Sequence, residues 1–185
     1  MSIIEQPRAA APVRSARFED EPGYYAPAGL WLYGNVRLLH GKLACVEEAL
    51  GQRDFAPPIL DAVERAAEQT VLAGKVLVCG VHNPAHQRAA IVPLRWGSPR
   101  IVVVSGGFLY HLGLQLKQEP FRAARLWRYE WDAKTDLIVS RRDPERLPTF
   151  AHHNPTVDRL IRELAQGTRH GLSSPLDSLT PLLAP

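Results

Sequence analysis

The sequence predicts an α/β protein with a doubly wound, mostly parallel sheet of four to five strands flanked by helices. Two unbroken apolar runs, 76–79 and 101–104, have strand length and lack the alternation of a half-exposed strand, which is typical of strands buried on both faces. The residues between them suffice for a right-handed crossover helix. Residues 83–84, Asn then Pro, suit the start of that helix, and Pro93 is expected to end or kink it near Val92.

The segments before this unit supply the first strands and one helix. Residues 30–34 form a short apolar run that a glycine ends, and 36–39 fit a helical turn. The run 42–46 is expected to be the first central strand. Apolar residues at helical spacing predict a helix over 59–73, which Gly74 ends.

Three further elements are expected after the second buried strand. Residues 108–111 suit a loop or a short turn, and Pro120 suits the start of a helix over 120–131. The run 136–140 is expected to be another strand. Residues 153–155 begin a last amphipathic helix that Gly167 ends. This alternation of strands and helices supports the α/β prediction.

Length and composition indicate one globular domain. Residues 1–27 are expected to be a flexible N-terminal arm, 28–167 the domain, and 168–185 a C-terminal tail. The formal charge of +3 permits an anionic partner without demanding one. No apolar run is long enough for a membrane span, and no signal-peptide core begins the chain, so the expected location is cytoplasmic.

Small residues end the two buried strands where ligands of open α/β sheets bind. Gly80 follows the first strand, and Ser105, Gly106 and Gly107 follow the second. Their backbone amides could approach a phosphate next to the helix start at Asn83. The alternative is that sharp turns between strand and helix simply require glycine.

Arginine and histidine are expected at the same edge. Arg141 and Arg142 close a strand and could bind phosphate. His153 and Asn154 stand at a helix start, where capping by Asn154 alone is the alternative. The twelve candidate ligand-binding residues are Gly80, His82, Asn83, His86, Ser105, Gly106, Gly107, Tyr110, Arg141, Arg142, His153 and Asn154.

Two further patterns leave alternatives open. His82 and His86 lie four apart, but no third metal ligand is evident, so polar contacts to a ligand or ordinary capping are expected and no metal. Three arginines at spacing three, interleaved with aromatic residues over 122–131, fit either single-stranded nucleic acid or a solvated basic face.

Known catalytic and nucleotide motifs are missing from the sequence. It contains neither the G-x-G-x-x-G fingerprint nor a P-loop, which argues against NAD binding and ATP hydrolysis. It has no Ser-His-Asp or Cys-His constellation and no G-x-S-x-G elbow. No reaction and no cofactor are therefore assigned. Cys45 and Cys79 lie in apolar runs and are expected to be reduced and buried.

Six segments, in order over residues 28–167, resemble the Rossmann-like domain of the DNA-processing protein A (DprA, also called Smf) family. They are LWLYGNVRLL, KVLVCGVHNPAHQRAA, GSPRIVVVSGG, the segment 108–111, DLIVSRRDP and FAHHNPTVDRLI. The chain departs from the family where Val-Gly-Ser-Arg is replaced by 46–49, VEEA, which places Glu47 and Glu48 where phosphate would approach. The Pro-Gly-Gly-x-Gly-Thr signature of the related LOG-type proteins is also missing.

The resemblance implies a Rossmann-like fold and binding of single-stranded DNA, with a recombinase as partner and a weakly indicated homodimer. It places Gly80, His82, Gly106, Gly107 and Arg141, together with Asn154, around the pocket. A nucleotide- or nucleoside-binding sensor or hydrolase of the LOG-like type is the second hypothesis. A non-catalytic scaffold that acts through protein contacts is the third. The two glutamates favour these last two.

Overall fold

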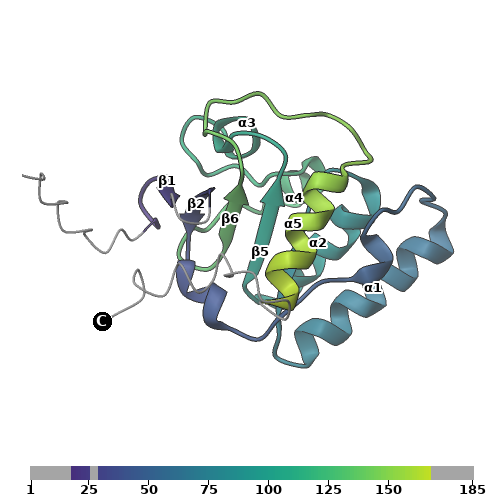
Figure 1. Cartoon of the computed structure of the whole chain (residues 1–185). Coiled ribbons are helices and arrows are strands. Elements are labelled where there is room, and N and C mark those ends of the chain that lie inside the picture. The colour runs from purple at the N-terminus through teal and green to yellow at the C-terminus, as the bar shows by residue number, and fades with distance from the viewer. Residues whose placement is uncertain (1–17, 26–28, 168–185) are drawn as a thin grey trace, which may run out of the picture.

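The computed structural model describes residues 18–25 and 29–167, which form an α/β domain built on one six-stranded sheet. The strands lie in the order β1-β2-β6-β5-β4-β3 (Figure 1). Their bounds are Gly23–Tyr25 (β1), Leu30–Gly34 (β2), Leu43–Ala44 (β3), Val76–Cys79 (β4), Arg100–Val104 (β5) and Leu137–Ser140 (β6). Strands β3, β4, β5 and β6 run parallel, while β1 and β2 add an antiparallel edge.

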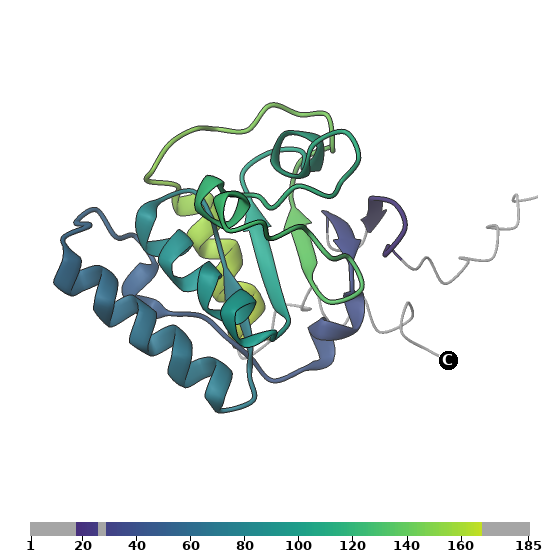
Figure 2. The ribbon, with the colours of Figure 1, turned by 180° about the vertical axis from the view of Figure 1, so that it is seen from behind.

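Helices cover both faces of this sheet. They are α1 (Pro57–Leu72), α2 (Pro84–Trp96), α3 (Phe108–Leu112), α4 (Arg122–Leu126) and α5 (Pro155–Gln166), with 3-10 turns η2 (Val36–His40) and η3 (Glu47–Ala49). Helix α5 crosses one face, and α1 and α2 lie on the other, as the two opposite views show (Figures 1 and 2). The sheet is therefore doubly wound, as the alternation of apolar runs and helical stripes predicts.

The side chains on the two faces of the parallel strands belong to two separate hydrophobic clusters. Leu77, Cys79 and Val102 pack with α1 and α2, whereas Val78 and Ile101 pack with α5. Every residue of β5 and β6 is buried, which confirms that unbroken apolar runs mark strands covered on both sides.

The number of strands exceeds the predicted four to five, and one extra strand lies inside the expected arm. Residues Gly23–Tyr25 pair with β2, and the side chains of Phe18 and Tyr25 are buried in the cluster on the α5 side. Three residues of strand are too short for a sequence period to show. Residues 1–17 and 26–27 of the expected arm, and the expected tail, 168–185, lie outside the described residues.

Three element boundaries differ from the prediction. Helix α2 continues through Pro93 to Trp96, because a proline in the last turn forfeits one hydrogen bond while its ring is buried. The expected helix over 120–131 is only α4, since Arg128 adopts a left-handed φ of 62° and the chain then turns back. The expected strand over 42–46 pairs at two residues only.

The expected helical turn at 36–39 is confirmed as η2, whereas residues 108–111, expected as a loop or short turn, belong to the short helix α3. No helix among the described residues is long and apolar enough to cross a membrane.

Candidate ligand-binding site at the carboxyl edge of the sheet

Strands β4, β5 and β6 end at one edge of the sheet, and α2 and α5 begin there. Two hollows open at this edge. The first, of about 300 Å³, lies between the ends of β5 and β6 and the first turn of α5, and its lining includes Arg141, Arg142 and Thr156. The second, of about 340 Å³, is lined by α3, by the start of α4 and by the segment 148–152. The hollows share Val103, Val104, Ser105 and Thr149, so they form one continuous edge.

Positive charge gathers on this edge. Arg141 and Arg142 line the first hollow, and Arg122 and Arg125 line the second. Among the described residues, no aspartate or glutamate belongs to either lining. The N-terminus of α5 adds the positive end of a helix dipole to the first hollow. Such an edge attracts anions.

The two arginines of the first hollow are partly held by the protein. Arg141 donates from Nη2 to Oε2 of Glu163 at 3.0 Å, but both side chains are nearly half exposed. Arg142 donates its backbone N–H to Oγ of Ser140 at 3.0 Å, while its side chain has one long contact of 3.5 Å to the carbonyl of Leu147. Both guanidinium groups therefore retain free donors for a ligand.

Exposed aromatic rings belong to the second hollow. Tyr110 of α3 is 52% exposed, and Phe150, in the segment after β6, is 86% exposed. Tyr110 belongs to the predicted set, whereas Phe150 does not. An exposed phenylalanine beside a cationic hollow is the signal that could have found it, but only once the fold brought the segment 148–152 next to α3 and α4.

The glycines at the strand ends are held against other chain segments. A Cβ on Gly106 would lie 2.4 Å from Cα of Pro148, and one on Gly107 would lie 2.0 Å from the carbonyl oxygen of Pro144. The N–H of Gly107 donates to the carbonyl of Arg146 at 2.7 Å. Close packing thus explains these two glycines without a ligand, and it is a different reason from the sharp turn that the sequence suggested, because neither glycine has a positive φ. A ligand role for them stays a prediction.

Both His-Asn-Pro sequences cap a helix, and the two caps touch. Asn83 accepts the N–H of His86 at the start of α2, and Asn154 accepts the N–H of Val157 at the start of α5. The side chain of Asn83 also donates to the carbonyl of His152 at 3.0 Å. Asn83 is buried, and both its side-chain oxygen and its side-chain nitrogen are hydrogen-bonded, whereas Asn154 lines the first hollow.

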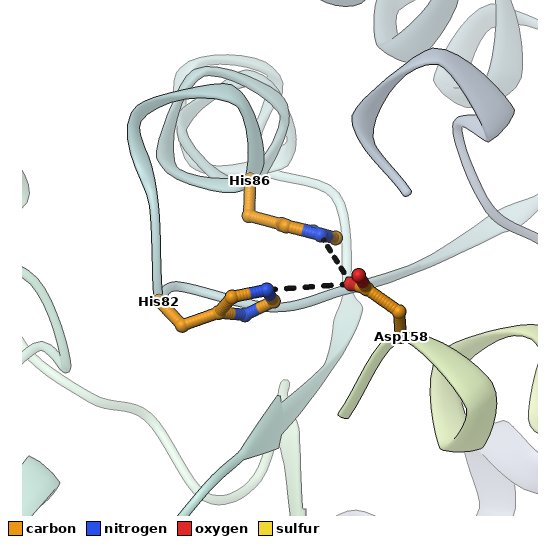
Figure 3. Close-up of side chains that lie close together, drawn as sticks. All are labelled: His82, His86 and Asp158. Carbon is orange, nitrogen blue, oxygen red and sulfur yellow. Dashed lines mark hydrogen bonds and ion pairs between the residues drawn. The ribbon is translucent and has the colours of Figure 1, made fainter. Parts of the chain in front are cut away.

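A second polar cluster lies where these two helices meet. His82, His86 and Asp158 converge beyond the end of β4 (Figure 3). Asp158 Oδ1 lies 2.9 Å from Nε2 of His86 and 3.3 Å from Nε2 of His82. Its other oxygen, Oδ2, accepts the N–H of Gly51 at 2.9 Å. The sequence pairs the histidines but misses Asp158, because 72 residues separate it from His86.

The pKa values of His86 and Asp158 favour a neutral imidazole beside an ionised carboxylate. Burial lowers the pKa of His86 despite its bond to Asp158. Burial opposes ionisation of Asp158, but the close His82 ring and the hydrogen bonds from His86 and Gly51 outweigh it and hold the pKa of Asp158 well below its usual range.

Not all of the remaining predicted residues line the two hollows. Arg128 lines neither of them, in contrast to Arg122 and Arg125. His86 and Gly80 are joined inside the cluster, where the N–H of Gly80 donates to Nδ1 of His86 at 3.2 Å. His153 lines the first hollow and contacts Nη2 of Arg53 through Nε2 at 3.1 Å.

The two glutamates that depart from the family pattern line neither hollow. Glu47 belongs to η3 and pairs with Arg162 at 3.3 Å, and Glu48 follows it on the same exposed turn. Their charge is therefore directed to the region beyond β3, away from the basic edge beside β5 and β6.

Searches against protein-family models, curated proteins and solved structures found no match to this chain. The resemblance to the DprA family consequently stays a prediction.

Proposed function

We propose that this protein binds single-stranded DNA along the carboxyl edge of its sheet. The observation that carries the proposal is the pair of adjoining hollows, with arginines in both, exposed aromatic rings in the second, and no acidic residue in either lining among the described residues. Proteins that bind single strands combine a basic groove for the backbone with rings on which bases stack.

The charge distribution supports a ligand with more than one phosphate. Arg141 and Arg142 stand in one hollow and Arg122 and Arg125 in the other, so a single phosphate could not meet all four. A strand that passes from one hollow to the other over Ser105 and the shared valines would present phosphates to both pairs.

The exposed aromatic rings supply the surface on which bases would stack, which is the second feature of proteins that bind single strands. Tyr110 and Phe150 leave large apolar surface in water, which a stacked base would cover. Stacking on an aromatic ring is worth about 1–3 kcal/mol per base and accepts every base. Binding with little sequence preference is therefore expected.

Fluorescence titration of a labelled oligo-dT strand at low and moderate salt tests this function. The full chain is expected to bind at low salt and to weaken steeply as salt rises, because phosphate neutralisation releases counterions. Arg141→Ala/Arg142→Ala should weaken binding and reduce the slope of log affinity against log salt by roughly 0.7 for each phosphate that the protein no longer neutralises. Phe150→Ala should weaken binding with little change in that slope.

The matched control removes two exposed arginines that lie elsewhere, Arg37 in η2 and Arg65 in α1. Arg37 follows β2, which runs antiparallel to β6, so it stands at the opposite edge of the sheet. Arg37→Ala/Arg65→Ala changes the net charge equally and should keep most of the affinity. Equal losses in the two double variants, or no binding at low salt, would contradict the proposal.

A thermal-shift screen of mononucleotides distinguishes nucleotide binding from the binding of single-stranded DNA. If nucleotides raise the melting temperature in proportion to their excess while oligo-dT does not bind, the site takes a small ligand and the DNA proposal is wrong. The recombinase partner and the homodimer that the resemblance implies stay predictions.

A further inference from the structure

We propose that His82, His86 and Asp158 form a binding site for one divalent transition-metal ion, with Zn²⁺ as the reference case. The site adjoins the second basic hollow, whose lining includes His82, and it requires no nucleic acid. Two imidazoles and one carboxylate suit Zn²⁺, and they leave coordination positions for water or a ligand.

The spacing of the three donor atoms fits one ion. One ligand atom from each of the three residues lies within 4.8 Å of the other two, and Oδ1 of Asp158 lies 2.9 Å from Nε2 of His86 and 3.3 Å from Nε2 of His82 (Figure 3). A tetrahedral ion with bonds of 2.0–2.1 Å holds its ligand atoms about 3.3 Å apart. A small widening of the triangle would therefore admit the ion.

His82 supplies the independent observation. Its side chain is only 6% exposed, and neither ring nitrogen has a hydrogen-bond partner, since the contact to Asp158 lacks hydrogen-bond geometry. Buried polar atoms in folded proteins are nearly always paired, because an unpaired one loses its hydration without compensation. An ion bound to Nε2 would satisfy one of these two ring nitrogens.

The carboxylate is already oriented for the task. Asp158 stands in the first turn of α5, and its Oδ2 accepts the N–H of Gly51, so Oδ1 is directed between the two rings. The rings lie close together, with centroids 4.3 Å apart. Hydrogen bonds from surrounding groups to a ligand residue, such as that from Gly51 to Asp158, hold metal ligands in place. Because His82 also lines the second hollow, an ion here would lie beside that hollow.

Ion binding must change the protonation of His86. Its Nδ1 accepts the N–H of Gly80 at 3.2 Å, so without metal the ring proton sits on Nε2 and is donated to Asp158. A metal at Nε2 needs that lone pair, so the one ring proton must move to Nδ1, which keeps the imidazole neutral. A protonated Nδ1 cannot accept from Gly80, so metal binding opens the contact between Gly80 and His86.

The experiment uses the full chain without an oligohistidine tag, stripped with a chelator and titrated with ZnCl₂ by calorimetry and with CoCl₂ by visible absorption. One saturable ion per chain is expected, with cobalt bands in the visible range. His82→Ala should weaken binding at least about tenfold and still fold, since His82 makes no hydrogen bond. Asp158→Asn should do the same while it keeps an oxygen for Gly51.

His40→Ala is the control, because His40 is an exposed histidine at the end of η2. Its affinity for the ion should equal that of the unchanged protein. In a ¹H–¹⁵N spectrum, the amide of Gly80 should shift on saturation with Zn²⁺. Lack of saturable binding, or equal affinity in His82→Ala, Asp158→Asn and the unchanged chain, would overturn the proposal and leave the cluster as a hydrogen-bonded link between α2 and α5.

Discussion

Replacement of Arg100 by methionine should destabilise the fold severely, because its guanidinium is fully buried and each of its three nitrogens donates a hydrogen bond. Arg100 donates from Nε to Oδ2 of Asp136 and from Nη1 to the carbonyl of Ala90, each at 3.0 Å, and from Nη2 to Oε1 of Glu119. The group also lies 5.7 Å from the ring centre of Trp131. Arg100→Met keeps the apolar stem but leaves two carboxyl groups buried without their cation.

The expected loss follows from that imbalance. Removal of one partner from a buried ion pair costs about 3–5 kcal/mol, because the remaining charge stays desolvated. Total stabilities of single domains are about 5–15 kcal/mol, so Arg100→Met should remove a large share of the free energy of unfolding. With about 2 kcal/mol per molar urea as the slope, the urea midpoint should fall by about 2 M.

Acid should partly rescue this variant. Burial raises the pKa of both Glu119 and Asp136, and the Arg100 charge opposes that rise. Without Arg100 their folded-state pKa values rise further above those of the unfolded chain. A carboxyl with a raised folded pKa loses stability as pH rises, so the deficit of Arg100→Met should shrink from pH 7 toward pH 5.

Urea unfolding followed by tryptophan fluorescence and circular dichroism measures these effects. The control is Arg162→Met, which breaks an exposed ion pair with Glu47 and should change the free energy of unfolding by less than about 1 kcal/mol. A loss below about 1 kcal/mol for Arg100→Met, or a deficit that grows on acidification, would refute the reasoning.

Two further predictions concern a buried histidine and a glycine. Burial lowers the pKa of His111 from 6.5 to about 4, so the stability that its neutral form contributes is present above pH 6.5 and is lost as pH falls toward 4. In urea unfolding of the unchanged chain, His111 should lower the free energy of unfolding by about 2 kcal/mol between pH 7 and pH 5. His111→Leu should abolish this part of the pH dependence. If the variant keeps the pH profile of the unchanged chain, the prediction is wrong. Gly34→Ala should cost at least about 2 kcal/mol in the same assay, because φ is 117° and the new Cβ would lie 2.1 Å from the carbonyl oxygen of Asp136. Gly74→Ala, where φ is also positive but nothing lies near, should cost less, and equal costs would show that the contact with Asp136 is unimportant.

The buried strands could be predicted from the sequence because burial on both faces leaves an unbroken apolar run. Runs of this kind locate β4, β5 and β6 within one or two residues. Strand β1 escapes because three residues carry no period. The strand expected over 42–46 is found as β3, but it pairs at two residues only and lies at the edge of the sheet rather than in its centre, because its pairing depends on neighbours distant in the chain. The helix that begins after Phe121 ends at Leu126, earlier than expected, because the chain reverses direction at Arg128. No local residue preference predicts that reversal.

The candidate site was predictable as far as chain order allows. The rule that ligands bind at the carboxyl ends of parallel strands leads to Ser105, Arg141 and Asn154, which all line the first hollow. It cannot lead to Phe150 or Asp158, because each acquires its neighbours only when segments some 40 to 70 residues apart fold together. Charge and aromatic character are visible in the sequence, whereas their convergence is a property of the fold.

The contrast between the two halves of the carboxyl edge decides where an anion would bind. Beside β4, the starts of α2 and α5 meet, and Asp158 already occupies the space with an ionised carboxylate. A phosphate there would face that charge and would need to displace the bond to His86. Beside β5 and β6 the start of α5 and four arginines face hollows whose linings carry no carboxylate among the described residues. An anionic ligand is therefore expected beside β5 and β6, and a cation beside β4, so that one edge holds two sites of opposite preference.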